Sequence, residues 1–148
     1  MTTPDGISSD DWDLVHELAV GIANAANEQE AACERYRLLE WLDELERKYG
    51  SAPSILAARA DFIGNVENKR DLLLRAHSLA EERHDMRNAL YVAHSLAELY
   101  LEEFQNAVEG RRWLQRVEDH LVQVDDGWFA EEYERLRAMA DELSQPGT

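Results

Sequence analysis

The chain has little cysteine, proline and glycine. Of its 148 residues, 1 is Cys, 3 are Pro and 7 are Gly. A single cysteine excludes an internal disulfide and favours a reducing compartment. We expect Cys33 to be a small apolar residue on a buried helix face. Residues 1–9 lack the basic and apolar regions of a signal peptide, and no segment reaches the roughly 20 apolar residues that cross a bilayer. The sequence therefore predicts a cytoplasmic protein.

Basic charge is also scarce. The 15 Lys and Arg residues are set against 31 Asp and Glu, which gives a formal net charge of -16. Nucleic acid and anionic membrane surfaces are disfavoured as partners, because both attract lysine and arginine. The acids are concentrated towards both ends, in residues 1–50 and 125–148, whereas residues 51–84 are balanced. This excess predicts a basic protein partner, with general solubility as the alternative explanation.

Hydrophobic residues recur at helical spacing, and no run alternates as a strand would. The sequence predicts an all-α fold of seven helices, over about 10–27, 28–50, 53–65, 66–84, 85–104, 106–124 and 128–143, with Ser9 as the first N-cap. Short loops make consecutive helices antiparallel, as three helical hairpins and a C-terminal capping helix. We expect residues 1–9 to be flexible, 10–143 to form one domain, and 144–148 to be a flexible tail.

A helical hairpin recurs after about 37 residues. The residues Leu56, Ala60, Ile63, Ala76, His77 and Ala80 fall opposite Ala93, Ala97, Tyr100, Trp113, Leu114 and Val117. Small residues at several of these positions allow two helices to approach closely. Units of this kind bury their apolar faces against neighbouring units and form scaffolds for binding.

The small and aromatic pair Ala97 and Tyr100 lies in the first helix of the second repeat, and Gly110, Leu114 and Val117 follow in its second helix. With these positions, residues 51–122 resemble the tetratricopeptide-repeat family. That family has a period of about 34 residues, so the resemblance is one of architecture. It implies a superhelix whose first helices line a concave surface.

The resemblance also implies which residues face that surface. The partner-binding positions that it suggests are Asn27, Asp61, Asn65, Tyr91, His94, Glu98 and Glu102, with Ala57 and Asn24 beside them. Trp128 and Trp12, near the ends of the array, are added as partly exposed contacts, because tryptophan is enriched at interface hot spots. This polar, mildly acidic set suits a basic peptide or protein surface. The alternative is that these are ordinary solvated positions.

Signatures of chemistry are missing. The chain has no glycine-rich phosphate loop, no nucleophile elbow and no cysteine pair, so we expect no enzymatic activity and no cofactor. His77, Glu81 and His84 share one helical face and could ligate zinc, with His94 as the only further ligand nearby. Because His77 occupies a packing position of the repeat, we interpret it as a packed histidine and expect no metal site.

Size, charge and the lack of catalytic motifs together favour a non-enzymatic protein-binding module. It is most like an immunity-type protein that neutralises a basic cognate toxin by covering its substrate-binding surface. The alternative is a tetratricopeptide-like chaperone or adaptor that holds a peptide in its concave groove. The sequence leaves open the identity of the partner, whether the groove or the acidic ends bind it, and whether the chain forms a homodimer.

Overall fold

The computed structural model describes residues 2–145, and within that range it consists of seven helices without a strand. The helices are α1 (Ser9–Ala23), α2 (Glu28–Tyr49), α3 (Pro53–Asp61), α4 (Val66–Glu82), α5 (Met86–Glu102), α6 (Ala107–Leu121) and α7 (Gly127–Leu143). The predicted all-α class is confirmed. Two predicted helices were too long, since α1 ends at Ala23 and α3 at Asp61. None of the described helices is both long and apolar enough to cross a membrane.

Side-chain caps explain where most of the helices begin. In six of the seven, the N-cap oxygen accepts a hydrogen bond from the backbone N–H three residues later, at 2.9–3.3 Å. These caps are Ser8, Asn27, Asn65, Asp85, Asn106 and Asp126. Each satisfies a backbone donor that has no partner inside its helix. The expected cap Ser9 is wrong by one residue, because Ser8 takes that position.

Helix α3 is the exception, because its own N-cap side chain makes no hydrogen bond. The carboxylate of Asp5 takes that role from a distance in sequence. It accepts hydrogen bonds from the backbone N–H of Ser54 at 2.7 Å and from the Ser54 hydroxyl at 2.8 Å. Ile7 is fully buried beside it. The N-terminal segment that we expected to be flexible is thus attached to the start of α3 through residues 5–7.

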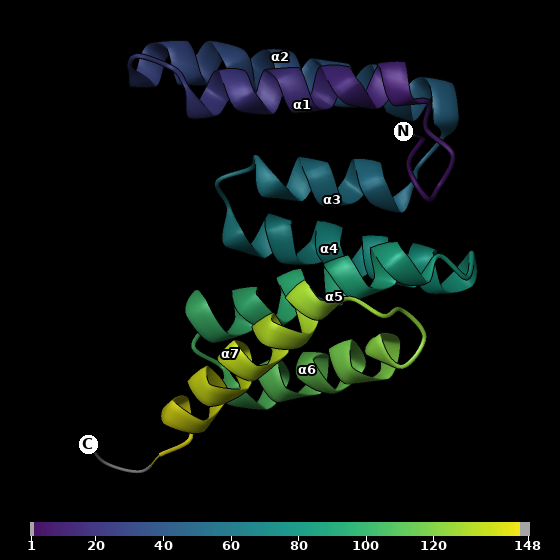
Figure 1. Ribbon diagram of the computed structural model, residues 1–148. Coiled ribbons are helices and arrows are strands. Elements are labelled where there is room, and N and C mark those ends of the chain that lie inside the picture. Colours follow the sequence, from purple (N-terminus) through teal and green to yellow (C-terminus); the bar gives the residue numbers. More distant parts are fainter. Residues whose placement is uncertain (1, 146–148) are drawn as a thin grey trace.

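The helices follow one another in space as they do in sequence (Figure 1). Helices α1 and α2 lie side by side at one end, α3 and α4 are next, and α5, α6 and α7 form the other end. Helix α7 contacts both α5 and α6, and α3 contacts α2, α4 and α5. The backbone of α1, in contrast, approaches only that of α2. The backbones of α1 and α3 are therefore not in close contact, and only side chains connect the two helices.

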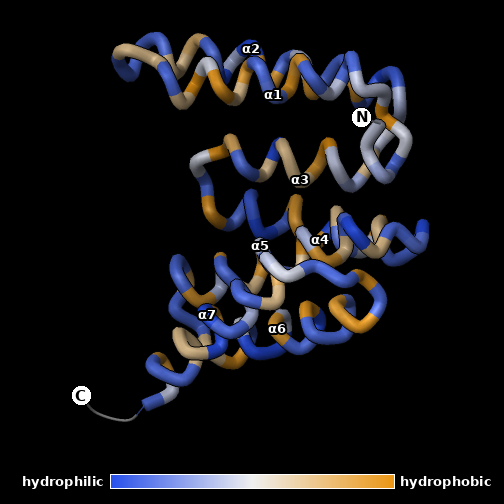
Figure 2. The backbone as a smooth tube through the Cα atoms, in the orientation of Figure 1, coloured by the Kyte–Doolittle hydropathy of each residue, from blue (hydrophilic) through white to orange (hydrophobic). Residues whose placement is uncertain are grey.

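The buried hydrophobic residues form two clusters. The larger cluster joins α3 to α7 and includes Leu73, Leu96 and Leu136. The smaller one joins α1, α2 and α3 around Leu42 and Ile55. Figure 2 shows hydrophobic and hydrophilic residues alternating along the helices, as expected when each helix buries one face.

Most residues at the repeated positions lie in the core, whereas Ile63 and Tyr100 are only partly buried. Ala60, Ala76, Ala97 and Val117 are all fully buried in the larger cluster. Gly110 is buried against Leu101 of α5, and an added Cβ would lie only 2.6 Å from the Leu101 Cγ atom. Small residues therefore stand where α3 to α6 pack closely.

Two other expectations concern single residues and the C-terminal tail. Cys33 is exposed, so its expected burial is wrong; it lies in the early part of α2, which extends past the end of α3 (Figure 1). Ser144 is not free, since its backbone N–H donates to the Ala140 carbonyl at the end of α7. Residues 146–148 of the expected tail lie outside the described residues.

Candidate partner-binding cleft

A cleft of about 360 Å³ lies between α1 on one side and α3 and α5 on the other. Its lining residues are Thr3, Pro4, Trp12, Val15, His16, Ala19, Ser54, Ala57, Ala58, Asp61, Phe62, Asn88 and Tyr91. The cleft lies where the α1 backbone does not approach α3, and three alanines, Ala19, Ala57 and Ala58, contribute to its lining beside larger side chains. Most of the lining is apolar, with a few polar groups, as is usual for ligand sites.

Asp61 and Tyr91 form the acidic part of the cleft. The Tyr91 hydroxyl donates a hydrogen bond to the Asp61 Oδ2 atom at 3.0 Å. Although Asp61 reaches solvent, burial raises the pKa of its carboxyl, an effect that the Tyr91 hydrogen bond and the charge of Lys69 oppose. Burial, and then the Asp61 carboxylate, raise the pKa of Tyr91, so its hydroxyl keeps its proton. Asp61 is the only acid among the lining residues.

Ser54 and Asn88 form a rigid part of the cleft wall. The Asn88 amide donates to the Ser54 hydroxyl at 3.2 Å and to the Asp85 carboxylate at 2.6 Å. Ser54 donates in turn to Asp5, so this network joins the N-terminal segment, α3 and α5. Because these polar groups already have partners, they hold the wall in place and leave Asp61 as the available charge.

Helix α7 covers the neighbouring part of α5. The Arg135 guanidinium lies 2.6 Å from Glu98, 2.9 Å from Glu132 and 3.5 Å from Glu102. The His94 Nε2 atom lies 2.9 Å from the Glu132 carboxylate. The structure thus places three predicted groove residues, His94, Glu98 and Glu102, against α7 instead of in an open groove.

The same cluster contains the ligand types of a metal site. Atoms of His94, Glu98 and Glu132 lie within 4.8 Å of one another. Arg135 donates hydrogen bonds to the carboxylates of Glu98 and Glu132. Its bond to Glu132, and then that of His94, lower the pKa of Glu132 to about 2. The guanidinium already compensates the negative charge that a cation would need. We therefore assign these residues to the attachment of α7.

The other predicted residues have different positions. The side chains of Asn27 and Asn65 accept from the backbone N–H groups of Glu30 and Asn68, so both act as helix caps. Trp128 is 59% exposed, and its ring lies against His94, with 5.4 Å between centroids. Of the predicted set, the structure brings Trp12, Ala57, Asp61 and Tyr91 together in the cleft and leaves Trp128 exposed beyond it.

Sequence reasoning missed Arg135, Glu132 and Phe62. A signal for Arg135 was present, because it follows Glu98 by 37 residues, the period of the repeat. Extension of the repeat into the last helix would have placed the two residues at equivalent positions. Phe62 gave no such signal, since it is the C-cap of a helix that was predicted to continue to Asn65.

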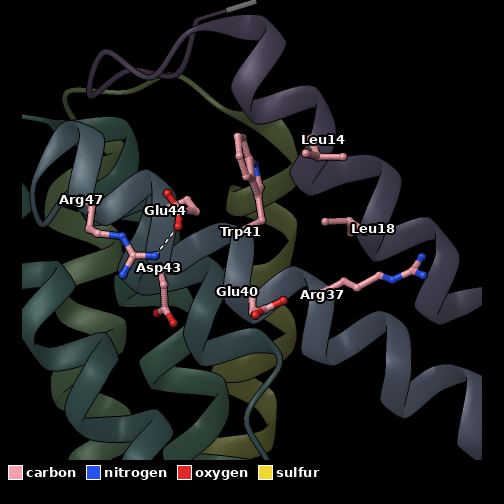
Figure 3. A pocket seen from close by; sticks show the side chains of 8 residues that line it. All are labelled: Leu14, Leu18, Arg37, Glu40, Trp41, Asp43, Glu44 and Arg47. Carbon is pink, nitrogen blue, oxygen red and sulfur yellow. Dashed lines mark hydrogen bonds and ion pairs between the residues drawn. The ribbon is translucent and has the colours of Figure 1, made fainter.

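A second hollow of about 450 Å³ lies on the other face of α1 and α2 (Figure 3). Its lining consists of Leu14, Leu18, Arg37, Glu40, Trp41, Asp43, Glu44 and Arg47. Several charges there are already paired: Arg47 with Glu44, and Asp43 with Arg59 at 2.9 Å. The hollow thus has three acids against two arginines, and two of those acids are already paired.

The predicted packed histidine, His77, is confirmed, with 2% of its surface exposed. Its Nε2 atom lies 3.0 Å from the Nε2 atom of His120 in α6, and its Nδ1 atom lies 3.1 Å from Glu81. Burial lowers the pKa of both histidines, so the pair is neutral at pH 7. His84 is exposed in the following turn and does not join them.

Comparison with protein-family models, with curated proteins and with solved structures found no match. A function for the chain is therefore inferred from its own contacts. Two of these contacts matter most: the single acid in an apolar cleft, and the helix that covers the adjacent part of α5.

Proposed function

We propose that the chain is a non-enzymatic protein-binding module whose partner is basic and binds along α1, α3 and α5. The observation that carries the proposal is the cleft between these helices, in which Asp61 is held by the Tyr91 hydroxyl. A cleft with apolar walls and one carboxylate suits a partner side chain that is apolar along its length and positively charged at its end.

The scaffold that we propose is a tetratricopeptide-like superhelix of three helical hairpins, with α7 as the cap. The packing of α3, α4, α5, α6 and α7 on their sequence neighbours supports it. Burial of Ala60 and Ala97 at equivalent positions supports the repeat. Helices α1, α3 and α5 are then the first helices of their hairpins, and these helices line the cleft.

The most specific version of the proposal is an immunity-type protein that neutralises a basic toxin in the cytoplasm. A net charge of -16 supports it, because complementary charge accelerates association and favours a basic partner. Neutralisation would occur by occlusion: the acidic helices cover the positive surface with which the toxin binds its substrate.

A chaperone or adaptor that holds a peptide is the second candidate. The cleft favours it, because a pocket between first helices can receive one side chain of an extended segment. The two candidates differ in which acids matter. Occlusion can use the outer face of α2, including Glu40 and Glu44, whereas peptide capture requires the cleft.

The first experiment is co-expression with a basic protein encoded next to this chain, followed by isothermal titration of the purified pair. We expect a 1:1 complex that weakens as salt increases, and rescue of cells if the neighbour is toxic. Asp61→Ala with Tyr91→Ala tests the cleft, and Glu40→Ala with Glu44→Ala tests the outer face. If the chain remains a monomer and neither binds nor rescues against any neighbouring product, the proposal is wrong.

A further inference from the structure

We infer that the cleft is an anchor site for one arginine side chain of the partner. This inference rests on the proposed function and makes it more specific. The cleft would receive the guanidinium at Asp61 and Tyr91, with the aliphatic part of the side chain between α1 and α3.

The acceptor arrangement favours a guanidinium. The Tyr91 hydroxyl uses its proton on Asp61 Oδ2, so the hydroxyl oxygen still has lone pairs, and Asp61 Oδ1 is a further acceptor beside it. The Tyr91 oxygen and Asp61 Oδ2, which lie 3.0 Å apart, can both accept from neighbouring N–H groups of one planar guanidinium. An ammonium group, as a compact point charge, matches such a pair of acceptors less well.

The walls favour the same group. Trp12 and Phe62 line the cleft with Val15, Ala57 and Ala58, so a bound side chain lies largely against apolar atoms. A guanidinium is more weakly hydrated than an ammonium group and stacks on aromatic faces, and the aliphatic part of arginine packs on apolar surface. Arginine is therefore the basic side chain that loses least hydration free energy on entering the cleft.

Charges around Asp61 leave it available. The charge of Lys69 lowers the pKa of Asp61 without a hydrogen bond between the two side chains, and the negative charge of Glu98 raises it. Among residues 2–145, Asp61 forms no ion pair with a lysine, an arginine or a histidine. Other acids on this side of the molecule have partners: Glu98 pairs with Arg135, and Asp5 accepts from Ser54. An incoming cation would thus meet one uncompensated carboxylate.

The test uses the whole chain and a short blocked peptide of alanines with one central arginine. Matched peptides carry lysine or uncharged citrulline in its place. We monitor the assigned indole N–H signal of Trp12 by NMR during titration. We expect the arginine peptide to shift this signal to saturation, with citrulline binding at least about tenfold more weakly, because a charge-assisted hydrogen bond is lost.

Asp61→Asn should weaken binding of the arginine peptide by about tenfold or more, and Tyr91→Phe should weaken it by a smaller factor. Asp13→Asn is the control, because it removes the same charge from an exposed position of α1 outside the cleft, and binding should not change. Circular dichroism of each variant verifies the fold. Equal affinity for arginine and citrulline peptides, or unchanged affinity in Asp61→Asn, would overturn the inference.

The outcome separates this inference from the function on which it rests. If a basic protein partner binds but Asp61→Asn leaves that complex unchanged, the proposed function stands and the arginine site is wrong. If the arginine peptide binds at the cleft while no basic protein does, the site stands and the proposed function is wrong.

Discussion

Substitution of Gly110 by alanine tests how closely α5 and α6 approach each other. Gly110 lies inside α6, where alanine would by itself stabilise the helix by about 0.8–1.0 kcal/mol. An alanine Cβ would, however, lie 2.6 Å from Cγ of Leu101 and closer still to one of its methyl groups. Leu101 is 1% exposed and belongs to the larger hydrophobic cluster, so its side chain is enclosed by other core residues.

The clash should therefore outweigh the gain in helix propensity. Overpacking of a core costs about 1–3 kcal/mol, and the upper half of that range applies here because a methine carbon of a buried side chain is involved. After the propensity gain is subtracted, we expect the free energy of unfolding to fall by about 1–2 kcal/mol. For a chain of this size, the melting temperature should fall by several degrees.

Urea denaturation measures this change, with Gly127→Ala as the control. Gly127 is also helical, but apart from its chain neighbours and the nearby backbone of its own helix no atom lies within 4 Å of an added Cβ, so the free energy of unfolding should change by about 0.5 kcal/mol or less. In a double-mutant cycle with Leu101→Ala, the two substitutions should be coupled by about 1 kcal/mol or more. If Gly110→Ala stabilises the protein as alanine does in an open helix, α5 and α6 do not pack closely at this position.

Three further predictions concern other contacts. Because burial lowers the pKa of His77 and His120, the unfolded chain binds more protons than the folded chain below about pH 6.5, and the free energy of unfolding should fall as the pH decreases from there. The fall should be smaller in His120→Leu. Urea titrations at pH 7.5 and 5 measure this, and an equal fall in both proteins would contradict it. Arg135→Gln removes the ion pairs to Glu98, Glu102 and Glu132, so it should lower the free energy of unfolding by about 1 kcal/mol and speed amide hydrogen exchange in α7. Unchanged exchange there would show that the ion pairs do not attach the helix. Asp5→Ala removes the acceptor for the Ser54 backbone N–H and should cost about 0.5–2 kcal/mol in thermal unfolding, whereas an unchanged melting temperature would mean that solvent replaces this cap.

The helices were largely predictable from the sequence. Their spacing of apolar residues and their Asn and Asp caps act within a few residues along the chain, so they can be recognised without a partner helix. The same holds for the small residues Ala60 and Ala97, whose recurrence predicted burial. The ends of α1 and α3 were less predictable, because Asn27 and Asn65 suit a helix end and a cap for the following helix equally well.

The candidate site was predictable only in part. The repeat placed Asp61 and Tyr91 on first helices, and the structure joins them by a hydrogen bond. It also shows that Glu98, at the equivalent position one repeat later, is paired with Arg135 of α7. No local pattern distinguishes these two acids, since the difference depends on which helix lies over each of them.

By itself, the sequence determined the all-α class, most helix starts, the acidic charge and the small residues of the core. Those properties follow from interactions between residues a few positions apart and from composition. Only the tertiary structure decided that Asp5 caps α3, that α7 covers part of α5, and that α1 stands apart from α3 and leaves a cleft. The physical reason is that the partner of a distant N–H group or carboxylate is set by how helices pack, and packing joins residues whose separation in sequence carries no local signal.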